Sequence, residues 1–416
     1  MKVSNFYVPA VSHRRAAGVR GTNGVHLQVS EDVLPSDLFP FDELTYPEVA
    51  SLPRDTPLVL PLGWGYDHTA LAARLGSPPQ IGRLPALPFG WQGSGLDVPQ
   101  PVFEAVLLNL LGNLLEDGFT QVFALVPSGL ELATDIPALI LPSHSLLTSL
   151  PSNNDRGKVI LIPIGHTEQH GYHAPLSTDT LIIEAIGRGT AKAVPEQAVC
   201  LPVSPYGVST HRRSFPGTFN VGGRAFEDFW LAVIDALVGR GFNRFYLLSG
   251  HGGNCSFLVN VVKYAGERYP YIFCATTGLY LNGPKGASAL EARRESPIGG
   301  MGHACELETS LILALRPELI HLERAVDEMD FVATPSYYMD WIEGGALIAN
   351  PPWDDDTQTG AYGAGSLGTK EKGEYWLKVA IEEKVDHVME IHEQYRRRRE
   401  RRPQRPNVCL HLRRYK

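Results

Sequence analysis

The sequence predicts an α/β protein built on parallel sheets, and the arrangement of apolar segments leads to this class. Short apolar runs such as Val159–Gly165 and Arg244–Leu248 are typical of buried strands, and segments with helical periodicity separate them. Strands that alternate with helices in this way form β-α-β units and a parallel sheet. The same series of segments occurs twice along the chain, so we expect the fold to be duplicated.

The internal repeat consists of three matched pairs of segments in the same order. They are Pro57–Gly63 with Val159–Gly165, Leu84–Gly90 with Leu201–Gly207, and Phe103–Phe119 with Phe226–Phe242. The last pair predicts a helix in each half, and a strand follows it at Gln121–Val126 or Arg244–Leu248. Both halves therefore read as strand, loop, strand, helix, strand. Trp376–Met389 has helical spacing of its apolar residues and predicts a long amphipathic helix near the end.

The two halves differ in their chemistry. The alignment sets Tyr66 against Glu168, His68 against His170, Ser77 against Asp179 and Ser128 against His251. A single remaining imidazole would bind a divalent ion very weakly. We predict a degenerate, non-catalytic domain over residues 1–145, a catalytic domain over residues 146–395, and a basic C-terminal tail over residues 396–416. The boundary falls where Pro, Ser and Asn cluster between residues 141 and 156.

The composition excludes several classes of protein. A formal net charge of −8 argues against nucleic-acid binding. The sequence has no apolar run long enough to span a membrane and no apolar secretory segment near its start. Five scattered cysteines without a CxxC pair indicate a reducing compartment, so we expect a cytoplasmic protein. The arginines at 396–399 are interpreted as a solvated terminus, since no aromatic platform accompanies them.

The main cluster of potential metal ligands follows directly after the run Val159–Gly165. It reads EQHGYHAPLSTD from Glu168 to Asp179, at the carboxyl end of a predicted strand, where open α/β sheets place their active sites. Glu168 and His170 lie on the same side of an extended segment, and the two oxygens of Asp179 can bridge a pair of ions. His251 follows a second predicted strand within the glycine-rich sequence GHGGN.

These side chains favour a hydrolytic metal site. Mixed carboxylate and imidazole ligands suit Zn²⁺, Mn²⁺ or Fe²⁺, and two such ions would share a hydroxide nucleophile. In the segment HACELE, Glu306 and Glu308 point about 200° apart on a helix, so only one of them should reach the metals. His303 at the mouth of that helix would suit a general acid. Cys305 is interpreted as inert core.

Five motifs resemble the creatininase family in order and spacing, over roughly residues 155–390. They are EQHGYHAPLSTD, HRRSFPGTF from His211, SGHGGN from Ser249, GGMGHACELETS from Gly299 and GAYGAGSLGTKEKGE from Gly360. The resemblance implies a three-layer α/β/α domain that binds two divalent ions and hydrolyses a C–N amide bond. By motif position it implies His303 as proton donor, Ser209 and His211 in the substrate pocket, and as metal ligands Glu168, His170, Asp179, His251 and Glu308.

One departure from the family pattern bears on the substrate. In creatininase proper an acidic ligand stands two positions after the histidine that matches His251, and this chain has Gly253 there. The chain is similar to the HGGN branch of the family, in which Glu308 would take over as ligand. The resemblance then implies a small-molecule substrate other than creatinine, such as a cyclic amide, a formamide or a small peptide-like amide, in biosynthesis.

Two alternatives stay open from the sequence. The same metal centre would suit hydrolysis or isomerisation of a non-amide cyclic ketone, and a protein that has lost catalysis in both halves would act as a scaffold. Family members are typically homohexamers, so the resemblance also implies a homo-oligomer.

Overall fold

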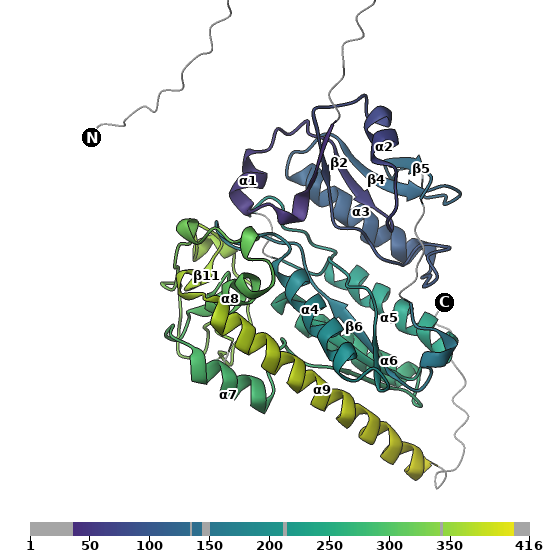
Figure 1. The fold of residues 1–416 in the computed structure, drawn as a ribbon, viewed down its shortest axis with the longest axis vertical. Helices are drawn as coiled ribbons and strands as arrows, with labels where there is room; N and C mark the ends of the chain where they lie inside the picture. The colour runs from purple at the N-terminus through teal and green to yellow at the C-terminus, as the bar shows by residue number, and fades with distance from the viewer. Residues whose placement is uncertain (1–35, 134, 144–149, 211–213, 342–343, 403–416) are drawn as a thin grey trace, which may run out of the picture. The chain divides into compact units, whose positions relative to one another are not determined.

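A computed structural model describes residues 36–402, apart from residue 134 and the segments 144–149, 211–213 and 342–343. These described residues belong to one compact unit. The unit contains two parallel sheets, one from each half of the chain, with helices packed against both (Figure 1). The predicted α/β class with parallel sheets is therefore confirmed.

The first sheet has the strand order β1-β3-β2-β4-β5, and all of its neighbouring strands are parallel. Leu58 and Leu60 of strand β2 pack into a core with helix α3, whereas Val59 between them packs with Leu71 of helix α2 on the other face. The elements are β1 (Asp37–Pro40), α1 (Tyr46–Ser51), β2 (Leu58–Pro61), α2 (His68–Arg74), β3 (Gln80–Arg83), α3 (Gln100–Glu116), β4 (Val122–Pro127) and β5 (Ala138–Leu141).

The second sheet has the order β7-β6-β8-β9, again with parallel neighbours. A short antiparallel pair, β10 with β11, lies outside it. The elements are β6 (Val159–Ile164), α4 (Thr178–Ala193), β7 (Ala198–Cys200), α5 (Gly223–Gly239), β8 (Arg244–Ser249), α6 (Cys255–Arg268), β9 (Phe273–Thr276), α7 (Pro284–Arg293), β10 (Met301–His303), α8 (Glu306–Leu315), β11 (Tyr362–Gly363) and α9 (Lys370–Arg401).

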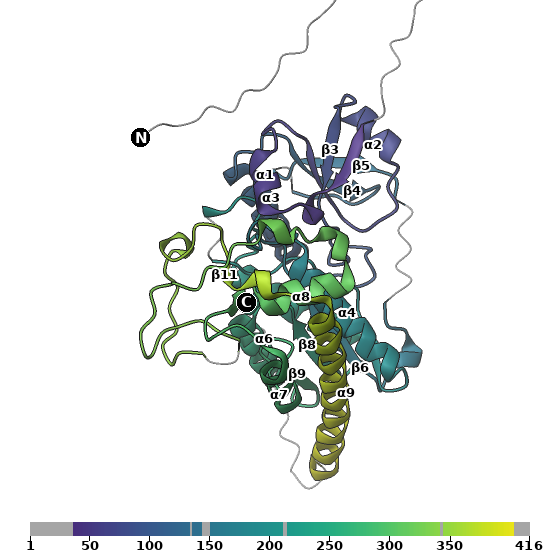
Figure 2. The same cartoon turned by 60° about the vertical axis from the view of Figure 1, so that its left-hand side comes forward.

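Helices cover both faces of the second sheet, as the alternation of side chains along β6 requires. Ile160 and Ile162 pack into a core with α5 and α6. Val159 and Leu161 point the other way, into a core with α4, α7, α8 and α9. Figure 2 shows α4 and α9 lying together beside β6 and β8. This arrangement confirms the predicted three-layer α/β/α architecture of the catalytic half.

The two sheets have corresponding strand orders, since β3-β2-β4-β5 matches β7-β6-β8-β9 along the sequence repeat. They also share one hydrophobic core, in which α3 packs against α5. The backbone N–H of Asn220 donates to the side chain of Asn113 across this contact, at 2.6 Å. The boundary expected near residue 145 thus separates the sheets but not the core. The correspondence supports duplication, and two separate domains stay a prediction.

Several elements differ from the sequence expectation. Helices α2 and α4 occupy segments that were expected to be loops, and strands β3 and β7 end just before the runs at 84–90 and 201–207. The pairing of Ser77 with Asp179 is wrong, because Ser77 follows the end of α2 whereas Asp179 lies in the first turn of α4. The connection from β2 to α2 is much shorter than that from β6 to α4, so one gap-free alignment cannot match both ends.

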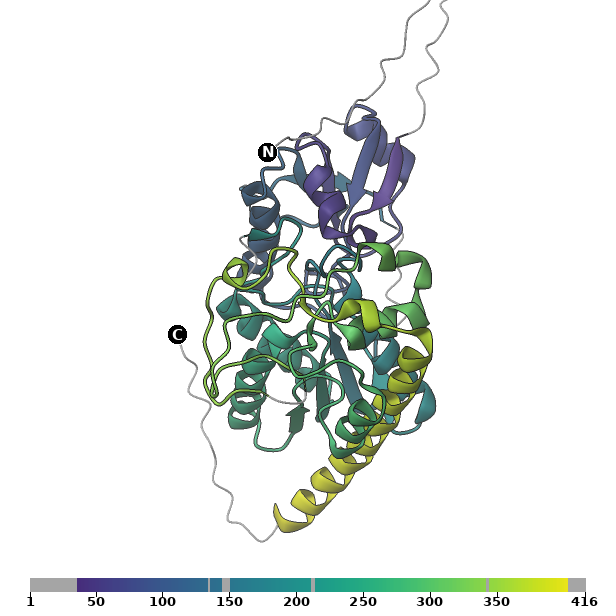
Figure 3. The ribbon, with the colours of Figure 1, turned by 90° about the vertical axis from the view of Figure 1, so that its left-hand side faces the viewer.

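The remaining chain is largely irregular between α8 and α9 (Figure 3). Helix α9 continues through Arg396–Arg399, where Arg396 pairs with Glu393 and Glu400; residues 403–416 of the predicted tail lie outside the described residues. Within the described chain, no helix has the length and apolarity needed to cross a membrane. Single 3-10 turns lie at Phe41–Glu43, Asn153–Asp155, Gly252–Asn254, Pro317–Leu319, Leu322–Arg324, Trp353–Asp355 and Gly365–Leu367.

Candidate metal centre

The predicted ligands meet at the carboxyl ends of β6 and β8, where parallel sheets place their active sites. Close packing of the N-terminus of α4 against both strand ends brings Asp179 into the cluster. A Cβ atom on Gly165 would lie 2.5 Å from the Cα of Thr180, and one on Gly250 would lie 2.4 Å from the carbonyl oxygen of Asp179. Both positions therefore need glycine, because any side chain would push helix α4 away from the strands.

Asp179 lies between two imidazoles and presents one oxygen to each. Its Oδ1 is 3.2 Å from Nε2 of His170, and its Oδ2 is 3.1 Å from Nδ1 of His251. Glu168 lies on the His251 side, with Oε1 2.9 Å from the same Nδ1. Glu308 lies on the His170 side, with Oε1 3.9 Å from Nε2. The structure thus brings together all five residues that the sequence analysis expected to bind metal.

The two glutamates of helix α8 point in different directions. Glu306 is buried against Lys372, whose Nζ is 2.7 Å away, and it accepts the backbone N–H of Ser296 at 2.8 Å. Glu308 faces the cluster instead, and its Oε2 accepts the backbone N–H of Cys305 at 3.3 Å. This divergence is the one that helical geometry requires for positions two residues apart. Cys305 itself is buried in the core that α8 and α9 share.

Backbone carbonyls fix the protonation of three histidines. Nδ1 of His170 lies 3.1 Å from the carbonyl of Glu168, Nε2 of His251 lies 3.0 Å from that of Val208, and Nε2 of His303 lies 2.7 Å from that of Gln169. A carbonyl oxygen only accepts hydrogen bonds, so each of these nitrogens carries the hydrogen. For His303 the carbonyl at 2.7 Å decides this, because the side-chain Nε2 of Gln169 lies farther from the same nitrogen, at 3.1 Å. In the neutral rings the other nitrogen therefore presents a lone pair to the carboxylate cluster.

This donor set fits divalent cations. Glu168 Oε1, His170 Nε2 and Asp179 Oδ2 are buried and have no hydrogen-bond partner among the described residues. Lone pairs of nitrogen and oxygen at about 3 Å repel each other unless a proton or a cation lies between them, and buried polar groups without partners are costly. Neutral imidazoles with carboxylates, and without a cysteine among them, are the ligands of Zn²⁺, Mn²⁺ and Fe²⁺ in hydrolytic sites.

The pKa values of the cluster reflect the same pairing. Burial opposes the charging of His170, but Asp179 outweighs it and raises its pKa to about 9. For His251, burial likewise opposes protonation, while Glu168 raises its pKa well above the ordinary value. Burial raises the pKa of Glu308 to about 7. Protons are therefore held where ligand nitrogens and oxygens face each other, and a divalent ion must displace them.

A cavity of about 640 Å³ opens onto the cluster. Ser209, a candidate substrate contact, lines the cavity and is buried, whereas the other candidate contact, His211, lies outside the described residues. His303 also lines the cavity, and its Nδ1 is 3.6 Å from Oε1 of Glu168. Its ring packs edge-on against Trp353 at 5.6 Å. His303 thus lies between the carboxylates and the space in which a substrate would bind.

The departure at Gly253 has a structural cause. A Cβ atom there would lie 2.2 Å from the carbonyl of Val208 and 2.5 Å from Nε2 of His251. The carbonyl of Val208 and the ring of His251, which are joined by a hydrogen bond, occupy this space. An acidic side chain at position 253 would therefore displace the ring of His251.

Sequence reasoning missed part of the cavity wall. Trp341 and Trp353 line the cavity but come from the irregular segment between α8 and α9, where no periodic pattern marks them. Gln169 was quoted only as part of a motif, yet its side-chain Nε2 donates to the carbonyl of Gly360 at 2.9 Å. The sequence signal that could have identified Gln169 is its position between two predicted ligands, Glu168 and His170.

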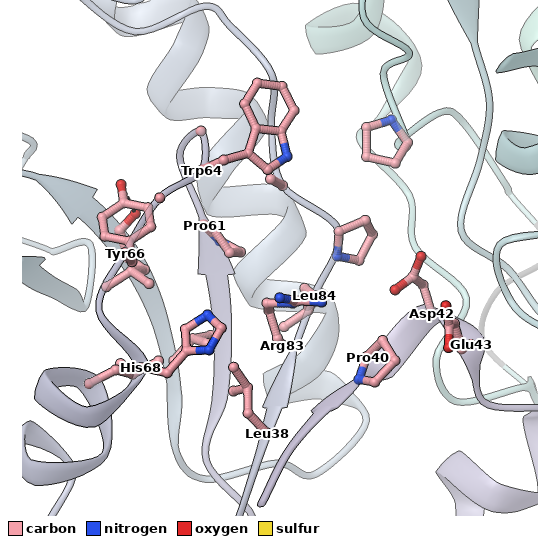
Figure 4. A pocket seen from close by; sticks show the side chains of 18 of the residues that line it. Leu38, Pro40, Asp42, Glu43, Pro61, Trp64, Tyr66, His68, Arg83 and Leu84 are labelled. Carbon is pink, nitrogen blue, oxygen red and sulfur yellow. Dashed lines mark hydrogen bonds between the residues drawn. The ribbon is translucent and has the colours of Figure 1, made fainter. Parts of the chain in front are cut away.

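The first half has a different cavity at the corresponding sheet edge. This cavity of about 390 Å³ is lined from the ends of β1, β2 and β3 and, from the second half, by Thr180, Glu184, Val203 and Pro205 (Figure 4). Tyr66 donates its hydroxyl to the carbonyls of Leu62 at 2.7 Å and Leu125 at 3.0 Å, and His68 is exposed at the start of α2. Among the described residues, every group of side chains arranged to hold a metal ion belongs to the second half.

The layered sheet and its buried carboxylate–imidazole cluster define a metal-dependent hydrolase of the α/β class. The family model described as creatininase, creatinine amidohydrolase, matches residues 147–388, which is more than half of the chain. The chain therefore belongs to the creatininase family and is a metal-dependent amide hydrolase, as the sequence motifs indicated.

Several curated proteins are similar to this chain. The creatinine amidohydrolase of Pseudomonas putida is 28% identical over 252 residues, which cover 56% of this chain and 89% of that protein. A mycofactocin precursor peptide peptidase of Mycobacterium ulcerans is 32% identical, covering 45% of this chain and 70% of that protein. A 3-dehydro-scyllo-inosose hydrolase of Thermotoga maritima is 32% identical, covering 46% and 61%. A solved structure named "Creatininase Mn" matches with 25% identity and a TM-score of 0.47, covering 56% of this chain and 91% of that one.

Proposed function

We propose that this chain hydrolyses a C–N amide bond in a small cyclic amide, formamide or peptide-like substrate, with two divalent ions of zinc, manganese or iron. The observation that carries the proposal is the placement of Asp179. Each of its oxygens lies about 3 Å from the free nitrogen of a different imidazole, His170 on one side and His251 on the other. A carboxylate in this position is suited to bridge two ions rather than to bind one.

The proposed ligands divide into two sets around this bridge. Glu168 and His251 would hold one ion together with Asp179, and His170 and Glu308 would hold the other. Bound there, the ions would supply a nucleophile formed from water near neutral pH and would polarise the substrate carbonyl.

His303 is proposed to move the proton. Burial lowers the pKa of His303 to about 4, so the ring is neutral at pH 7. Its Nε2–H is held by the carbonyl of Gln169, which leaves Nδ1 to accept a proton from the attacking water. The same Nδ1 would then deliver this proton to the nitrogen that leaves when the C–N bond breaks. Trp353 packs against the ring and would keep it in the orientation that this transfer needs.

The cavity wall supports a neutral substrate body. Among the described lining residues, the acidic and imidazole side chains all belong to the metal centre. The rest of the wall is apolar or uncharged, with aromatic side chains that suit a ring or an apolar group. Members of this wall are Ser209, Phe215, Phe257, Leu279, Trp341 and Trp353.

A second candidate reaction is hydrolysis of a non-amide cyclic ketone at the same centre. The similarity to 3-dehydro-scyllo-inosose hydrolase favours it, since that relative acts on such a compound by its name. A scaffold without catalysis is disfavoured, because a buried cluster of carboxylates without a cation would be retained at a cost in stability. Oligomeric assembly and a cytoplasmic location stay predictions, which light scattering and cell fractionation would test.

Product analysis tests the proposal. The metal-loaded full-length protein is incubated with a panel of cyclic amides, formamides, short peptides and cyclic ketones, and products are identified by mass spectrometry. Release of an amine or ammonia with the matching acid is expected, together with loss of turnover in Asp179→Asn. The exposed Asp228→Asn serves as the matched control and should keep full activity. Full activity in Asp179→Asn, or cleavage of ketones alone, would contradict amide hydrolysis at this centre.

A further inference from the structure

His166 lies in the same loop as the proposed ligands, two residues before Glu168, and has no role so far. Its side chain is completely buried. Its ring lies 4.4 Å from that of His251, centroid to centroid. Together with Glu168 and His251 it forms a group whose possible ligand atoms lie within 4.8 Å of one another, so distance alone would make it a metal ligand.

The hydrogen bonding of His166 is the reverse of that of the other three histidines. Its Nδ1 receives the backbone N–H of Gly207 at 2.9 Å. An amide N–H only donates, so Nδ1 must present its lone pair to it, and the hydrogen of the neutral ring must sit on Nε2. His170, His251 and His303 give their hydrogens to carbonyls and turn lone pairs to the cluster. His166 alone turns an N–H toward it.

Loop packing holds this orientation in place. The hydroxyl of Thr180, in the first turn of α4, donates to the carbonyl of His166 at 2.9 Å. Turning the ring over would set a carbon against the N–H of Gly207 and leave that buried donor unpaired, which is costly. The ring therefore cannot turn Nδ1 to the cluster without losing this hydrogen bond.

Among the described residues, the N–H of His166 has one acidic oxygen in reach. Nε2 is 3.8 Å from Oε2 of Glu168, while Oε1 of the same carboxylate contacts His251. Nε2 is buried and has no hydrogen-bond partner among the described residues. An ordinary hydrogen bond of about 3 Å would require Nε2 and Oε2 to approach each other by roughly 0.8 Å.

We propose that His166 is a positioning residue, which donates from Nε2 to Oε2 of Glu168 and so directs Oε1 to the metal, and that it is not itself a ligand. This inference rests on the proposed metal centre. Partners of this kind fix the rotation of a ligating carboxylate, and their loss typically costs roughly 10–100-fold in metal affinity.

Two substitutions separate the donor from the acceptor of His166. In His166→Asn the side-chain oxygen can still accept the N–H of Gly207, but the donor toward Glu168 is gone. In His166→Gln the longer side chain can return an N–H to the place of Nε2, but the acceptor for Gly207 is lost. The affinity of each metal-free, full-length variant for Zn²⁺ is measured by chelator competition, and its folding by thermal unfolding.

The expected result is a roughly 10–100-fold loss of Zn²⁺ affinity in His166→Asn with an unchanged number of bound ions, and near wild-type affinity in His166→Gln. Loss of one bound ion in both variants would show that His166 is a ligand. Unchanged affinity in His166→Asn would show that His166 only packs in the core. Either result overturns the inference. If the wild-type protein binds no Zn²⁺, the proposed metal centre itself is overturned together with this inference. Zn²⁺ binding by the wild-type protein therefore distinguishes a failure of the metal centre from a failure of the role of His166.

A measurement on the wild-type protein does not depend on either variant. Nitrogen-15 NMR of the histidine side chains reports which ring nitrogen carries hydrogen. His166 is expected to keep its hydrogen on Nε2 before and after Zn²⁺ is added. Loss of that hydrogen on Zn²⁺ binding would identify a ligand nitrogen and refute the proposal.

Discussion

Gly250 touches the backbone of Asp179: a Cβ atom at position 250 would lie 2.4 Å from the carbonyl oxygen of Asp179. The end of strand β8 and the first turn of α4 are thereby held together, and the carboxylate that faces both imidazoles depends on this contact. The position of this central carboxylate is therefore set partly by a residue that has no side chain.

Substitution Gly250→Ala should weaken metal binding and folding together. The added methyl group must displace α4, and overpacking of this kind typically costs about 1–3 kcal/mol in the free energy of unfolding. Gly266→Ala is the matched control, because Gly266 is exposed in helix α6 and its Cβ would meet nothing within 4 Å. That variant should gain about 0.5–1 kcal/mol. Equal stability and metal content in both variants would refute the contact.

The two glutamates of α8 should give opposite results when neutralised. Glu308→Gln should lower the number of bound ions and leave unfolding of the metal-free protein nearly unchanged. Glu306→Gln should keep the metal content but destabilise the fold by about 1–3 kcal/mol, because the buried Lys372 would keep only the exposed Glu295 as a charged partner. Metal analysis and chemical denaturation of both variants distinguish these outcomes, and loss of metal from Glu306→Gln alone would reverse the assignment.

Metal-free protein should lose stability as the pH rises from 6.5 to 9. The pKa of His170 is raised to about 9 in the folded state, against about 6.5 in the unfolded state. The stabilisation from its proton is therefore fully present below pH 6.5 and is lost as the pH rises through 9. The pKa of Glu308 is also raised in the folded state, to about 7, so loss of its proton likewise lowers the stability at the lower end of this pH range.

Metal binding should show the opposite dependence on pH. A divalent ion displaces these protons, so its affinity rises across the same interval. Thermal unfolding of chelator-treated and metal-loaded protein at each pH checks both trends. Metal-free protein that becomes more stable toward pH 9 would contradict the account.

The sequence repeat provides a matched pair of histidines. Replacing His170 by alanine should remove at least one of the two bound ions. The same change at His68, its counterpart in the first half, should leave the metal content and turnover unaltered, since His68 is exposed and belongs to none of the metal-competent groups among the described residues. A fall in metal content in His68→Ala would show that the first half retains a metal site.

The sequence predicted the parallel α/β architecture and the clustering of the proposed ligands because both depend on local signals. Apolar runs mark the strands, and Glu168, His170 and His251 follow strand ends that meet at one sheet edge. The shared core of the two halves was not predictable, since the apolar face of α3 does not reveal that α5 covers it. The proposed role of His166 was not predictable either, because it depends on the backbone N–H of Gly207, which lies 41 positions away in the sequence.

Anomalous X-ray diffraction from crystals of the full-length protein soaked with Zn²⁺ tests the central claim most directly. Two peaks about 3.5–4 Å apart are expected, one beside His251 and Glu168 and the other beside His170 and Glu308, with Asp179 between them. A single peak, or peaks away from Asp179, would contradict a bridged pair of ions at this site.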